Sequence, residues 1–363
     1  MPVLSALRRI APPPRYLTMP SIGVDISDTS MKYIAFSAPD RKGVRELTAW
    51  GDIDIPTNVL RRGYVENEEQ LTAVLREFQE RTGAEYVRVS LPEERAYLFE
   101  TEIKRDVPAK EVRSLLEFRL EENVPIPLRE ALFDYEILPT PDDARKLRVA
   151  VAAYARETIA RYFSACTAAG LTPLSFEVEA QAMARAVIPP GETGTVMLVD
   201  FGKTRTGVGI VHNGSLLYTS TIDVGGGQLS QSLRKVHGDV PESQLTKIKN
   251  SEGLIRGANN ARTYEALLGT ISVIKDEIIT RMQYWHTRKS NGEARRIGSV
   301  ILCGGSSNLK GLPDYLTDTL GVPSTRAQVW QHAFDPSEIV PPIDRRHSYG
   351  YATAIGLALE QRI

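Results

Sequence analysis

Residues 22–32 read IGVDISDTSMK, and residues 198–207, about half the chain later, read LVDFGKTRTG. In both stretches an apolar strand delivers an aspartate, Asp25 or Asp200, into a tight turn of small polar residues, and a second apolar segment follows. Such a turn presents backbone N–H groups and hydroxyls beside a carboxylate. That chemistry grips phosphates while an aspartate holds a hydrated Mg²⁺. Two such turns facing each other would clamp a nucleoside triphosphate from both sides.

Composition excludes several other classes of protein. The chain has 363 residues and a formal net charge of −1. A single core rarely grows beyond about 250–300 residues, so we expect two lobes. The near-neutral net charge gives no electrostatic reason to expect nucleic-acid binding, which requires a basic surface. Cys166 and Cys303 lie in apolar stretches, which favours buried thiols in a reducing compartment. No apolar run approaches the roughly 20 residues of a membrane helix.

The order of the predicted elements repeats once along the chain. The first set comprises strands at 22–25, 31–37 and 44–52, a helix at 68–81 and a strand at 86–91. The second set comprises strands at 196–201, 206–212 and 215–223, helices near 228–236, 243–250 and 264–285, a strand at 300–303, and helices at 313–320 and 351–360. This repetition predicts a duplicated α/β domain with a cleft between its halves.

Residues 93–171 differ in character from both sets and predict a small inserted α+β domain. It would contain a helix at 109–122, strands at 132–138 and 146–154, and a helix that ends at Gly170. The expected apolar stripes are Val112, Leu115, Leu116 and Leu120 on the first helix, and Ile159, Tyr162, Phe163 and Cys166 on the second. The first lobe would then comprise 21–92 and 172–192. The second would comprise 193–363 with a helical subdomain at about 235–298, and residues 1–20 would form a flexible tail.

Asp25 and Asp200 are the strongest site candidates, because a charge at the end of an apolar strand is costly unless it meets a cation or hydrogen-bond donors. A single Asp in such a position commonly caps its own turn. Two turns of like composition at like positions are hard to obtain from that tendency alone. We therefore predict that both aspartates are catalytic and that both hold Mg²⁺ through water.

The residues around each aspartate are the predicted phosphate ligands. They are Ser27, Thr29, Ser30 and Lys32 in the first turn, and Gly202, Lys203 and Thr204 in the second. Lys32 would reach the terminal phosphates as a point charge, and a solvated strand lysine is an equal alternative. Lys203 and Arg205 also fit charges at the rim of the site.

Two glycine-rich turns and one pair of acids complete the candidate site. Gly226 and Gly227 precede a helix, where backbone approaches a ligand closely and the helix N-terminus points at it. Gly304, Gly305, Ser306 and Ser307 follow the last strand and would let a flat base lie against the main chain. Glu177 and Glu179 stand where a strand gives way to a helix, and Glu179 is the predicted residue that orients a water against the γ-phosphate. First-turn acids favoured by the helix dipole are an alternative explanation.

In this order the elements resemble the actin-like ATPase superfamily, with phosphate loops at 25–32 and 200–207 and an adenosine loop at 304–307. Within it the chain is similar to the type IV pilus assembly protein PilM family, which is related to the cell-division protein FtsA. The resemblance rests on EENVPIP at 121–127, EAQAMARA at 179–186, GGGQLS at 225–230, LKGLP at 309–313 and AIGLAL at 354–359. It covers nearly everything from Ser21 onward.

The resemblance implies a fold, a cofactor and a partner. The fold is a duplicated, ribonuclease H-like domain pair with ATP and Mg²⁺ in the interlobe cleft, where Lys247 is a further nucleotide contact. The partner is the cytoplasmic N-terminal segment of PilN, an inner-membrane protein, bound in a groove beside the inserted domain. The expected groove residues are Leu91, Tyr97, Phe99, Val124 and Ile126. The protein would thus lie in the cytoplasm at the inner membrane, associated with the membrane through PilN and other pilus assembly proteins.

Departures from the family pattern favour nucleotide binding over turnover. Ser27 stands where the family usually has Gly, Gln244 replaces a Glu that usually meets the ribose, and Ser307 is polar where a small apolar residue is usual. We therefore expect a nucleotide-loaded adaptor that is at most a slow ATPase, in which ATP sets the closure of the two lobes and closure sets the affinity for the PilN segment. One alternative is a filament-forming protein like FtsA, although residues 360–363 end without the amphipathic membrane helix of that relative. Another is a small-molecule kinase, which would need a catalytic Asp that the inserted domain does not evidently offer.

Overall fold

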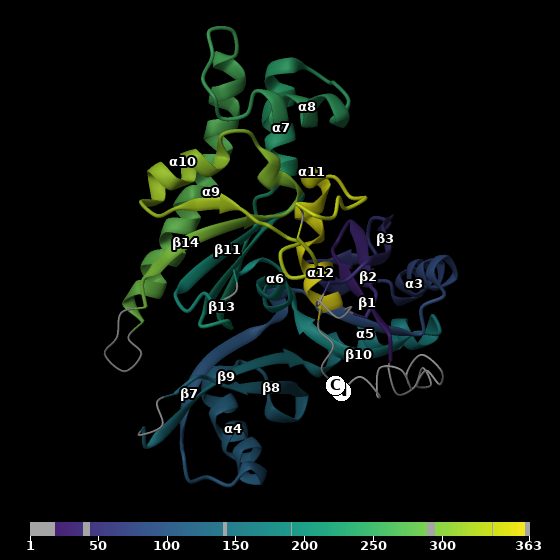
Figure 1. The fold of residues 1–363 in the computed structure, drawn as a ribbon, viewed down its shortest axis with the longest axis vertical. Coiled ribbons are helices and arrows are strands. Elements are labelled where there is room, and N and C mark those ends of the chain that lie inside the picture. The colour runs from purple at the N-terminus through teal and green to yellow at the C-terminus, as the bar shows by residue number, and fades with distance from the viewer. Residues whose placement is uncertain are drawn as a thin grey trace.

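The structure is a computed structural model that describes residues 19–38, 44–140, 144–189, 191–288, 295–335 and 337–359. The predicted tail at 1–20 therefore lies almost entirely outside the described residues. The described chain contains two five-stranded sheets, one three-stranded sheet and one two-stranded hairpin, with helices between and around them (Figure 1).

The two five-stranded sheets share one topology. The first has the order β10-β6-β1-β2-β3, formed by β1 (Ser21–Ile26), β2 (Ser30–Phe36), β3 (Leu47–Asp54), β6 (Tyr86–Leu91) and β10 (Thr172–Val178). The second has the order β13-β12-β11-β14-β15, formed by β11 (Thr195–Phe201), β12 (Thr206–His212), β13 (Ser215–Ile222), β14 (Ile297–Cys303) and β15 (Ser324–Arg326). In both sheets the middle strand, β1 or β11, runs antiparallel to the next strand in the chain and parallel to its other neighbour. The predicted duplication is confirmed.

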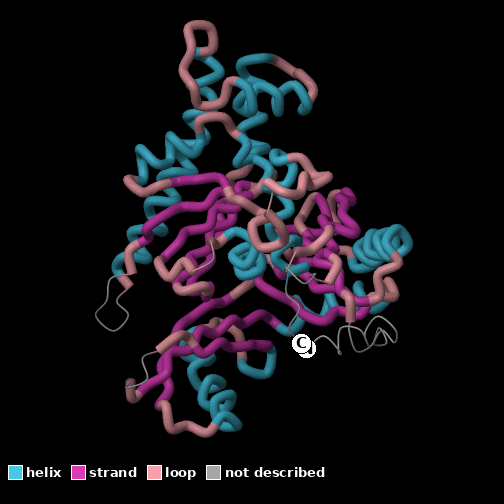
Figure 2. The backbone as a smooth tube through the Cα atoms, viewed as in Figure 1, coloured by secondary structure: helices cyan, strands magenta, loops and turns pink. Residues whose placement is uncertain are grey.

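Two short helices pack against each other between the sheets, α6 (Glu179–Val187) and α12 (Ala352–Leu359) (Figure 2). Their closeness depends on glycine. A Cβ added to Gly356 would lie 1.7 Å from the carbonyl oxygen of Ala182, and one added to Gly23 on β1 would lie 2.3 Å from the carbonyl oxygen of Ala354. These contacts fix the first sheet, α12 and α6 as one packed unit.

The remaining helices flank the sheets. On the first sheet's side are α3 (Glu68–Thr82) and α5 (Arg156–Ala168), beside the small hairpin β4 (Leu60–Arg61) and β5 (Tyr64–Val65). On the second sheet's side are α7 (Gly226–His237), α8 (Glu242–Ser251), α9 (Ala261–Thr287) and α10 (Leu312–Leu320). The turn between β12 and β13 has positive φ at Asn213 and Gly214, as the predicted hairpin requires.

Residues 97–155, within the predicted inserted domain, form a separate layer with its own core, placed below the two large sheets in Figure 1, whereas α5 packs with the core of the first lobe. Helix α4 (Ala109–Asn123) covers a sheet with the order β7-β9-β8, formed by β7 (Tyr97–Lys104), β8 (Ala131–Ile137) and β9 (Lys146–Ala155). The prediction of two strands was wrong because β7 was missed. Its charged residues are satisfied by cations on β9, since Glu100 pairs with Arg148 and Glu102 with Lys146, each at 2.8 Å.

Two predicted apolar stripes are narrower than expected. Leu115 on α4 is 40% exposed and Phe163 on α5 is 50% exposed. Each helix packs on one side only, so its buried side chains lie in one row along the helix. In α4 this row consists of Val112, Leu116 and Leu120. Among the described helices, none is both long and apolar enough to cross a bilayer.

Candidate functional site

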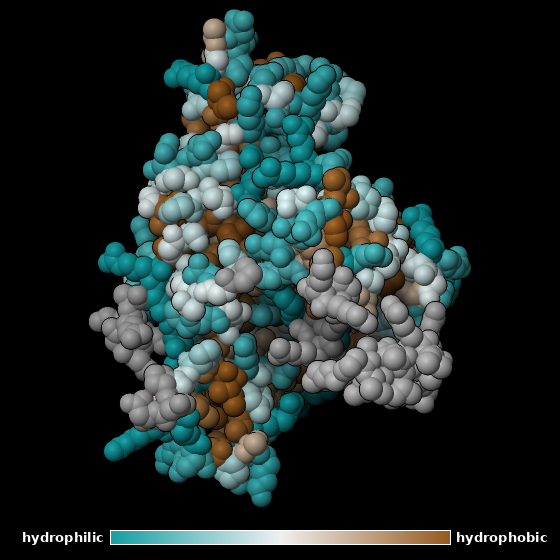
Figure 3. Space-filling view, viewed as in Figure 1, coloured by the Kyte–Doolittle hydropathy of each residue, from teal (hydrophilic) through white to brown (hydrophobic). Residues whose placement is uncertain are grey.

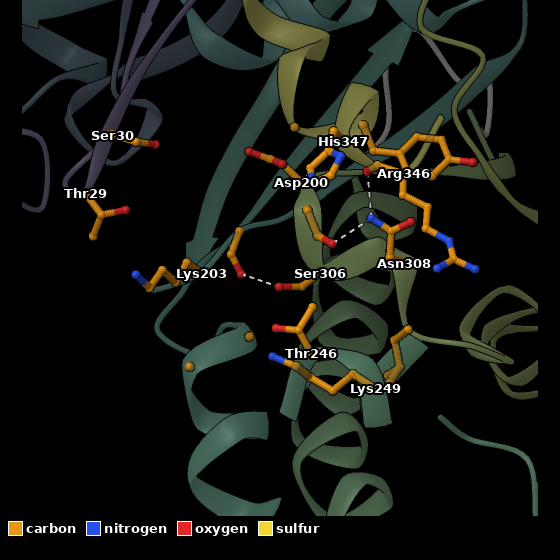
Figure 4. A pocket seen from close by; sticks show the side chains of 18 of the residues that line it. Thr29, Ser30, Asp200, Lys203, Thr246, Lys249, Ser306, Asn308, Arg346 and His347 are labelled. Atoms are coloured by element: carbon orange, nitrogen blue, oxygen red, sulfur yellow. Dashed lines mark hydrogen bonds between the residues drawn. The ribbon is translucent and has the colours of Figure 1, made fainter. Parts of the chain in front are cut away.

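The two aspartate turns line one cleft of about 2100 Å³ between the five-stranded sheets. Asp25, near the end of β1, and Asp200, near the end of β11, both face it. Glu179 and most of the predicted nucleotide ligands also line it: Ser27, Thr29, Ser30, Lys32, Gly202, Lys203, Thr204, Gly226, Gly227, Lys247, Gly304, Gly305 and Ser306. Figure 4 shows Thr29 and Ser30 on one side of the cleft and Lys203, Thr246 and Ser306 on the other.

The first turn closes on itself without backbone strain. The Ser27 N–H donates to the Ser30 carbonyl at 2.9 Å, and the Ser30 N–H donates to Ser27 Oγ at 3.2 Å. Ser27 is not among the described residues with positive φ, so a serine where the family usually has glycine is compatible with this backbone. The Ser27 hydroxyl takes part in holding the turn.

Each turn offers two consecutive backbone N–H groups that donate to no other group in the described chain. They belong to Asp28 and Thr29 in the first turn and to Lys203 and Thr204 in the second, which are three and four residues after Asp25 and Asp200 respectively. Adjacent unpaired N–H groups in a turn form a concavity that suits an anion. The matching offsets give both turns the same capacity to bind phosphate.

The second turn is held from behind by the start of α7. The Gly226 N–H donates to the Gly202 carbonyl at 2.9 Å, and the Gly227 N–H donates to the Lys203 carbonyl at 2.7 Å. These two amides, which the sequence suggested were directed at a ligand, therefore position the turn. A Cβ added to Gly226 would lie 2.1 Å from Ser306 Oγ, which itself donates to the Gly202 carbonyl at 3.0 Å.

The loop after β14 also packs closely against the second aspartate. Gly304 has φ +81°, and a Cβ there would lie 2.4 Å from Asp200 Oδ1. Ser307 is fully buried, and its hydroxyl donates to the Gly304 carbonyl at 2.7 Å. It is not among the cleft residues, so its role in the structure is to hold the loop, contrary to the predicted ligand contact.

The two aspartates lie in an environment that disfavours their charged forms, although Lys32 is close to both. Ser90 Oγ donates to Asp25 Oδ1 at 2.8 Å, whereas the Asp200 carboxylate accepts no hydrogen bond from the described residues. Burial raises the pKa of Asp25, opposed by Lys32 and the Ser90 hydrogen bond. Burial and then the charge of Asp25 raise the pKa of Asp200 to about 7, opposed by Lys32. A cation between the two carboxylates would relieve this repulsion.

The donor set suits an ion that is also held by water and phosphate oxygens. Among the described residues no group of three or more His, Cys, Asp or Glu side chains is placed to hold a metal. Mg²⁺ typically keeps several waters and takes one or two carboxylates together with substrate phosphates. The pair formed by Asp25 and Asp200 fits that pattern.

Of the two acids at the junction of β10 and α6, only Glu179 lines the cleft. Glu177 forms an ion pair with Arg185 at 2.6 Å. Burial, followed by the charges of Glu93 and Asp25, raises the pKa of Glu179 well above its usual value. Burial and the neighbouring acids therefore favour the protonated form of Glu179.

Sequence reasoning missed Glu93, which also lines the cleft. It begins a short helix, η1 (Glu93–Arg95), directly after β6, and it is 5% exposed. Thr219 Oγ1 donates to Glu93 Oε2 at 3.4 Å, and burial followed by the charge of Asp200 raises the pKa of Glu93 to about 8. Its sequence signal was an acid after a buried strand, the same signal that identified Asp25.

Two other regions line the cleft. One is the loop and short helix near the C-terminus, where Asp344–His347 and Tyr349–Tyr351 reach the cleft. The other is α8, where Lys247 lines the cleft and Gln244 does not. On α8, Lys249 Nζ donates to Ser230 Oγ at 2.9 Å and pairs with Glu242 at 3.2 Å.

Arg205 joins the two halves across the cleft. Its guanidinium forms an ion pair with Asp28 in the first turn at 3.1 Å and another with Glu94 of η1. The Arg205 side chain is 16% exposed, so it is a bridging residue more than the rim charge that we expected. A second pair, between Arg62 and Asp223, also joins the first lobe to the second.

A second, apolar groove of about 370 Å³ lies between the three-stranded module and the first sheet. Its apolar lining includes Leu91, Leu98, Leu132, Phe133, Tyr135, Ile159, Phe176, Val178 and Leu216. Figure 3 shows apolar side chains gathered over this module. Of the five predicted groove residues only Leu91 lines it. Phe99 and Val124 are buried in the module's own core, and Tyr97 and Ile126 pack against that core.

Comparisons with known proteins agree on one fold. A solved structure of a PilM–PilN type IV pilus biogenesis complex matches with a TM-score of 0.75 at 22% identity, covering 94% of this chain and 98% of that chain. MreB5 of Spiroplasma citri matches with a TM-score of 0.51 when bound to ADP, at 12% identity over 87% of this chain and 94% of that chain. Bound to AMPPNP it matches at 0.52, with 13% identity over 92% and 93%. The predicted actin-like fold is confirmed.

The family is shown by a sequence comparison. The family model described as type IV pilus assembly protein PilM matches residues 23–362, which is nearly the whole chain. The stretch includes both aspartate turns, the three-stranded module and the loop after β14. The chain belongs to the type IV pilus assembly protein PilM family.

Proposed function

We propose that this chain is an ATP-binding adaptor of the type IV pilus assembly machinery that docks the cytoplasmic N-terminal segment of PilN. The observation that carries the nucleotide half is the matched pair of turns, each with a strand-end aspartate and two unpaired N–H groups beside one cleft. Relatives of the same fold have been solved with ADP and with AMPPNP, which supports the choice of an adenine nucleotide.

Different residues of the cleft would contact different parts of the nucleotide. The N–H groups of Thr29, Lys203 and Thr204 would donate to phosphate oxygens, and Lys32 would add a positive charge. Asp25 and Asp200 would hold Mg²⁺ through water, and the ion would supply charge neutralisation at the phosphates. Glu179 would orient a water and accept its proton. Lys247, Gly304 and Gly305 would border the nucleoside.

The apolar groove supports the partner half of the proposal. PilM is in complex with PilN in the solved relative. In this chain the groove runs along β8, whose only strand partner among the described residues is β9, so β8 has a free edge. An extended segment can add to such an edge while its apolar side chains enter the groove. Asp134 and Glu136 on β8 would favour basic residues in that segment.

The proposal also includes how the chain divides into domains and where in the cell the protein lies. Residues 21–92 with 172–192 would form the first lobe, 93–171 the inserted domain, and 193–363 the second lobe with a helical subdomain at about 235–298. An inner-membrane partner would hold the protein at the cytoplasmic face of the membrane, near other inner-membrane pilus assembly proteins.

Calorimetry with matched variants tests each half. Asp200→Ala should abolish binding of AMPPNP·Mg²⁺, whereas Asp318→Ala, an exposed aspartate on α10, should bind like wild type. Leu132→Glu should abolish binding of a PilN peptide, whereas Ile137→Glu, on the same strand but outside the groove, should not. Nucleotide binding that survives Asp200→Ala, or peptide binding that survives Leu132→Glu, would contradict the respective half.

A further inference from the structure

The apolar groove follows the free edge of β8. The consecutive residues 132–136 of this strand all line the groove. Side chains alternate between the two faces of a strand, so a groove lined by consecutive residues follows the edge of the strand and not one of its faces. No strand other than β9 pairs with β8 in the described part of the chain. The second edge of β8 is therefore open to an added strand.

The groove has an apolar lining whose charges are all negative. Its charged lining residues are Asp134, Glu136 and Glu177. Glu177 is neutralised by Arg185, whereas Asp134 and Glu136 have no cationic partner among the described residues. An occupant with large apolar residues, basic residues and no acids would complement this lining.

The chain itself contains a segment with that composition. Residues 1–18 read MPVLSALRRIAPPPRYLT, contain no acid, and lie outside the described residues. Within them, residues 3–10 hold four large apolar side chains and two arginines. The prolines at 12–14 lack an N–H group, so a strand formed by residues 3–10 would end before them. Its eight residues match β8, which has seven.

The connection to the first sheet is long enough for this segment to reach the groove. Ser21, the first residue of β1, is the register partner of Tyr86 on β6. Leu91, which lines the groove, is five residues further along β6, a distance of about 17 Å. Residues 11–20 would span about 30 Å as an extended, proline-containing connection. Residues 3–10 can therefore reach the groove of their own chain.

We propose that residues 3–10 of this chain bind along β8 as an added strand and compete there with the PilN segment. This inference rests on the proposed function and adds its regulation. Because the segment is tethered to the groove that it binds, its effective concentration is on the order of 1 mM. A segment whose own Kd is a few-fold below that value occupies the groove in most molecules until PilN displaces it.

The test is a competition measurement on the full chain. A fluorescently labelled peptide of the N-terminal cytoplasmic segment of PilN is titrated with wild type and with the double variant Leu7→Glu/Arg9→Glu. We expect the variant to bind the peptide with a Kd about fivefold lower, because its own segment no longer competes. Without peptide, backbone hydrogen exchange at 131–137 should be faster in the variant than in wild type, because the edge of β8 loses its added strand.

Arg15→Glu/Leu17→Glu is the matched control, because it makes the same two changes on the other side of the prolines. It should keep the wild-type peptide Kd and exchange rates. An equal peptide Kd for wild type and Leu7→Glu/Arg9→Glu overturns the inference and leaves the adaptor function standing. An equal gain in affinity in the control also overturns it. Protection of 131–137 that rises with protein concentration would assign the groove to a second copy and overturn the contact within one chain. A peptide that binds none of these proteins overturns the proposed docking itself.

Discussion

Arg205 in the second turn forms an ion pair with Asp28 in the first turn at 3.1 Å, so the two aspartate turns are linked by charge as well as by the cleft that they line. The same guanidinium reaches Glu94 at the entrance to the three-stranded module. One side chain therefore contacts both halves of the duplicated fold and the start of the module between them.

Arg205→Ala should lower stability because it removes the cation that pairs with two largely buried acids. Asp28 and Glu94 are only 17% and 14% exposed, and removing one partner of such a pair typically costs about 3 kcal/mol. Thermal unfolding followed by circular dichroism should show a lower midpoint. Arg234→Ala, which breaks an exposed pair with Glu242, is the control and should cost less than about 1 kcal/mol. Equal midpoints for the two variants would count against the linkage.

Glu93→Gln should stabilise the nucleotide-free protein in a pH-dependent way. The pKa of Glu93 is raised from 4.5 to about 8, chiefly by burial. Below pH 4.5 the carboxyl is protonated in the folded and unfolded states, so it exerts no pH-linked penalty there. Between pH 4.5 and 8 the unfolded state loses its proton first, and the penalty on folding grows to on the order of 5 kcal/mol. The midpoint difference between variant and wild type should grow from pH 5 to pH 8. A midpoint difference that stays constant from pH 5 to pH 8 would contradict the raised pKa of Glu93.

Gly356→Ala should destabilise the contact between the two central helices. The added Cβ would lie 1.7 Å from the backbone carbonyl oxygen of Ala182, and overpacking of this kind typically costs about 1–3 kcal/mol. Gly269→Ala on α9 is the control. It has no atom within 4 Å of the added Cβ, and it should stabilise the helix by roughly 0.5–1 kcal/mol. Chemical denaturation should shift the two midpoints in opposite directions, and shifts of the same sign would refute the packing argument.

The cysteines should resist labelling in the folded protein. Cys166 and Cys303 are fully buried, and burial raises the pKa of Cys166 to about 12. The thiolate is the reactive form, so a disulfide reagent at pH 8 should react only as fast as the chain opens. Reaction of either thiol at the rate of a small free thiol would show that its site is open.

The aspartate turns were predictable because each is a local pattern, an apolar strand that ends in Asp followed by small polar residues, and the pattern occurs twice. Glu93 was missed although it also follows a buried strand, because its importance arises from contact with β12 and β13, which the sequence does not reveal. The loop at 344–351 lacks any motif and reaches the cleft only through tertiary packing. Ser307 was predicted as a ligand contact because it belongs to a recognisable loop. Its side chain instead points into the protein, where the hydroxyl donates to the Gly304 carbonyl.

The central claim is that Asp25 and Asp200 converge on one metal-bearing adenine nucleotide. A crystal structure with AMPPNP and Mn²⁺ tests it most directly, because the anomalous signal of the ion locates the metal. The predicted result is a single peak between the two carboxylates, with the phosphates against the N–H groups of Thr29, Lys203 and Thr204. An empty cleft in a crystal saturated with nucleotide, or an ion and phosphates bound elsewhere, would contradict it.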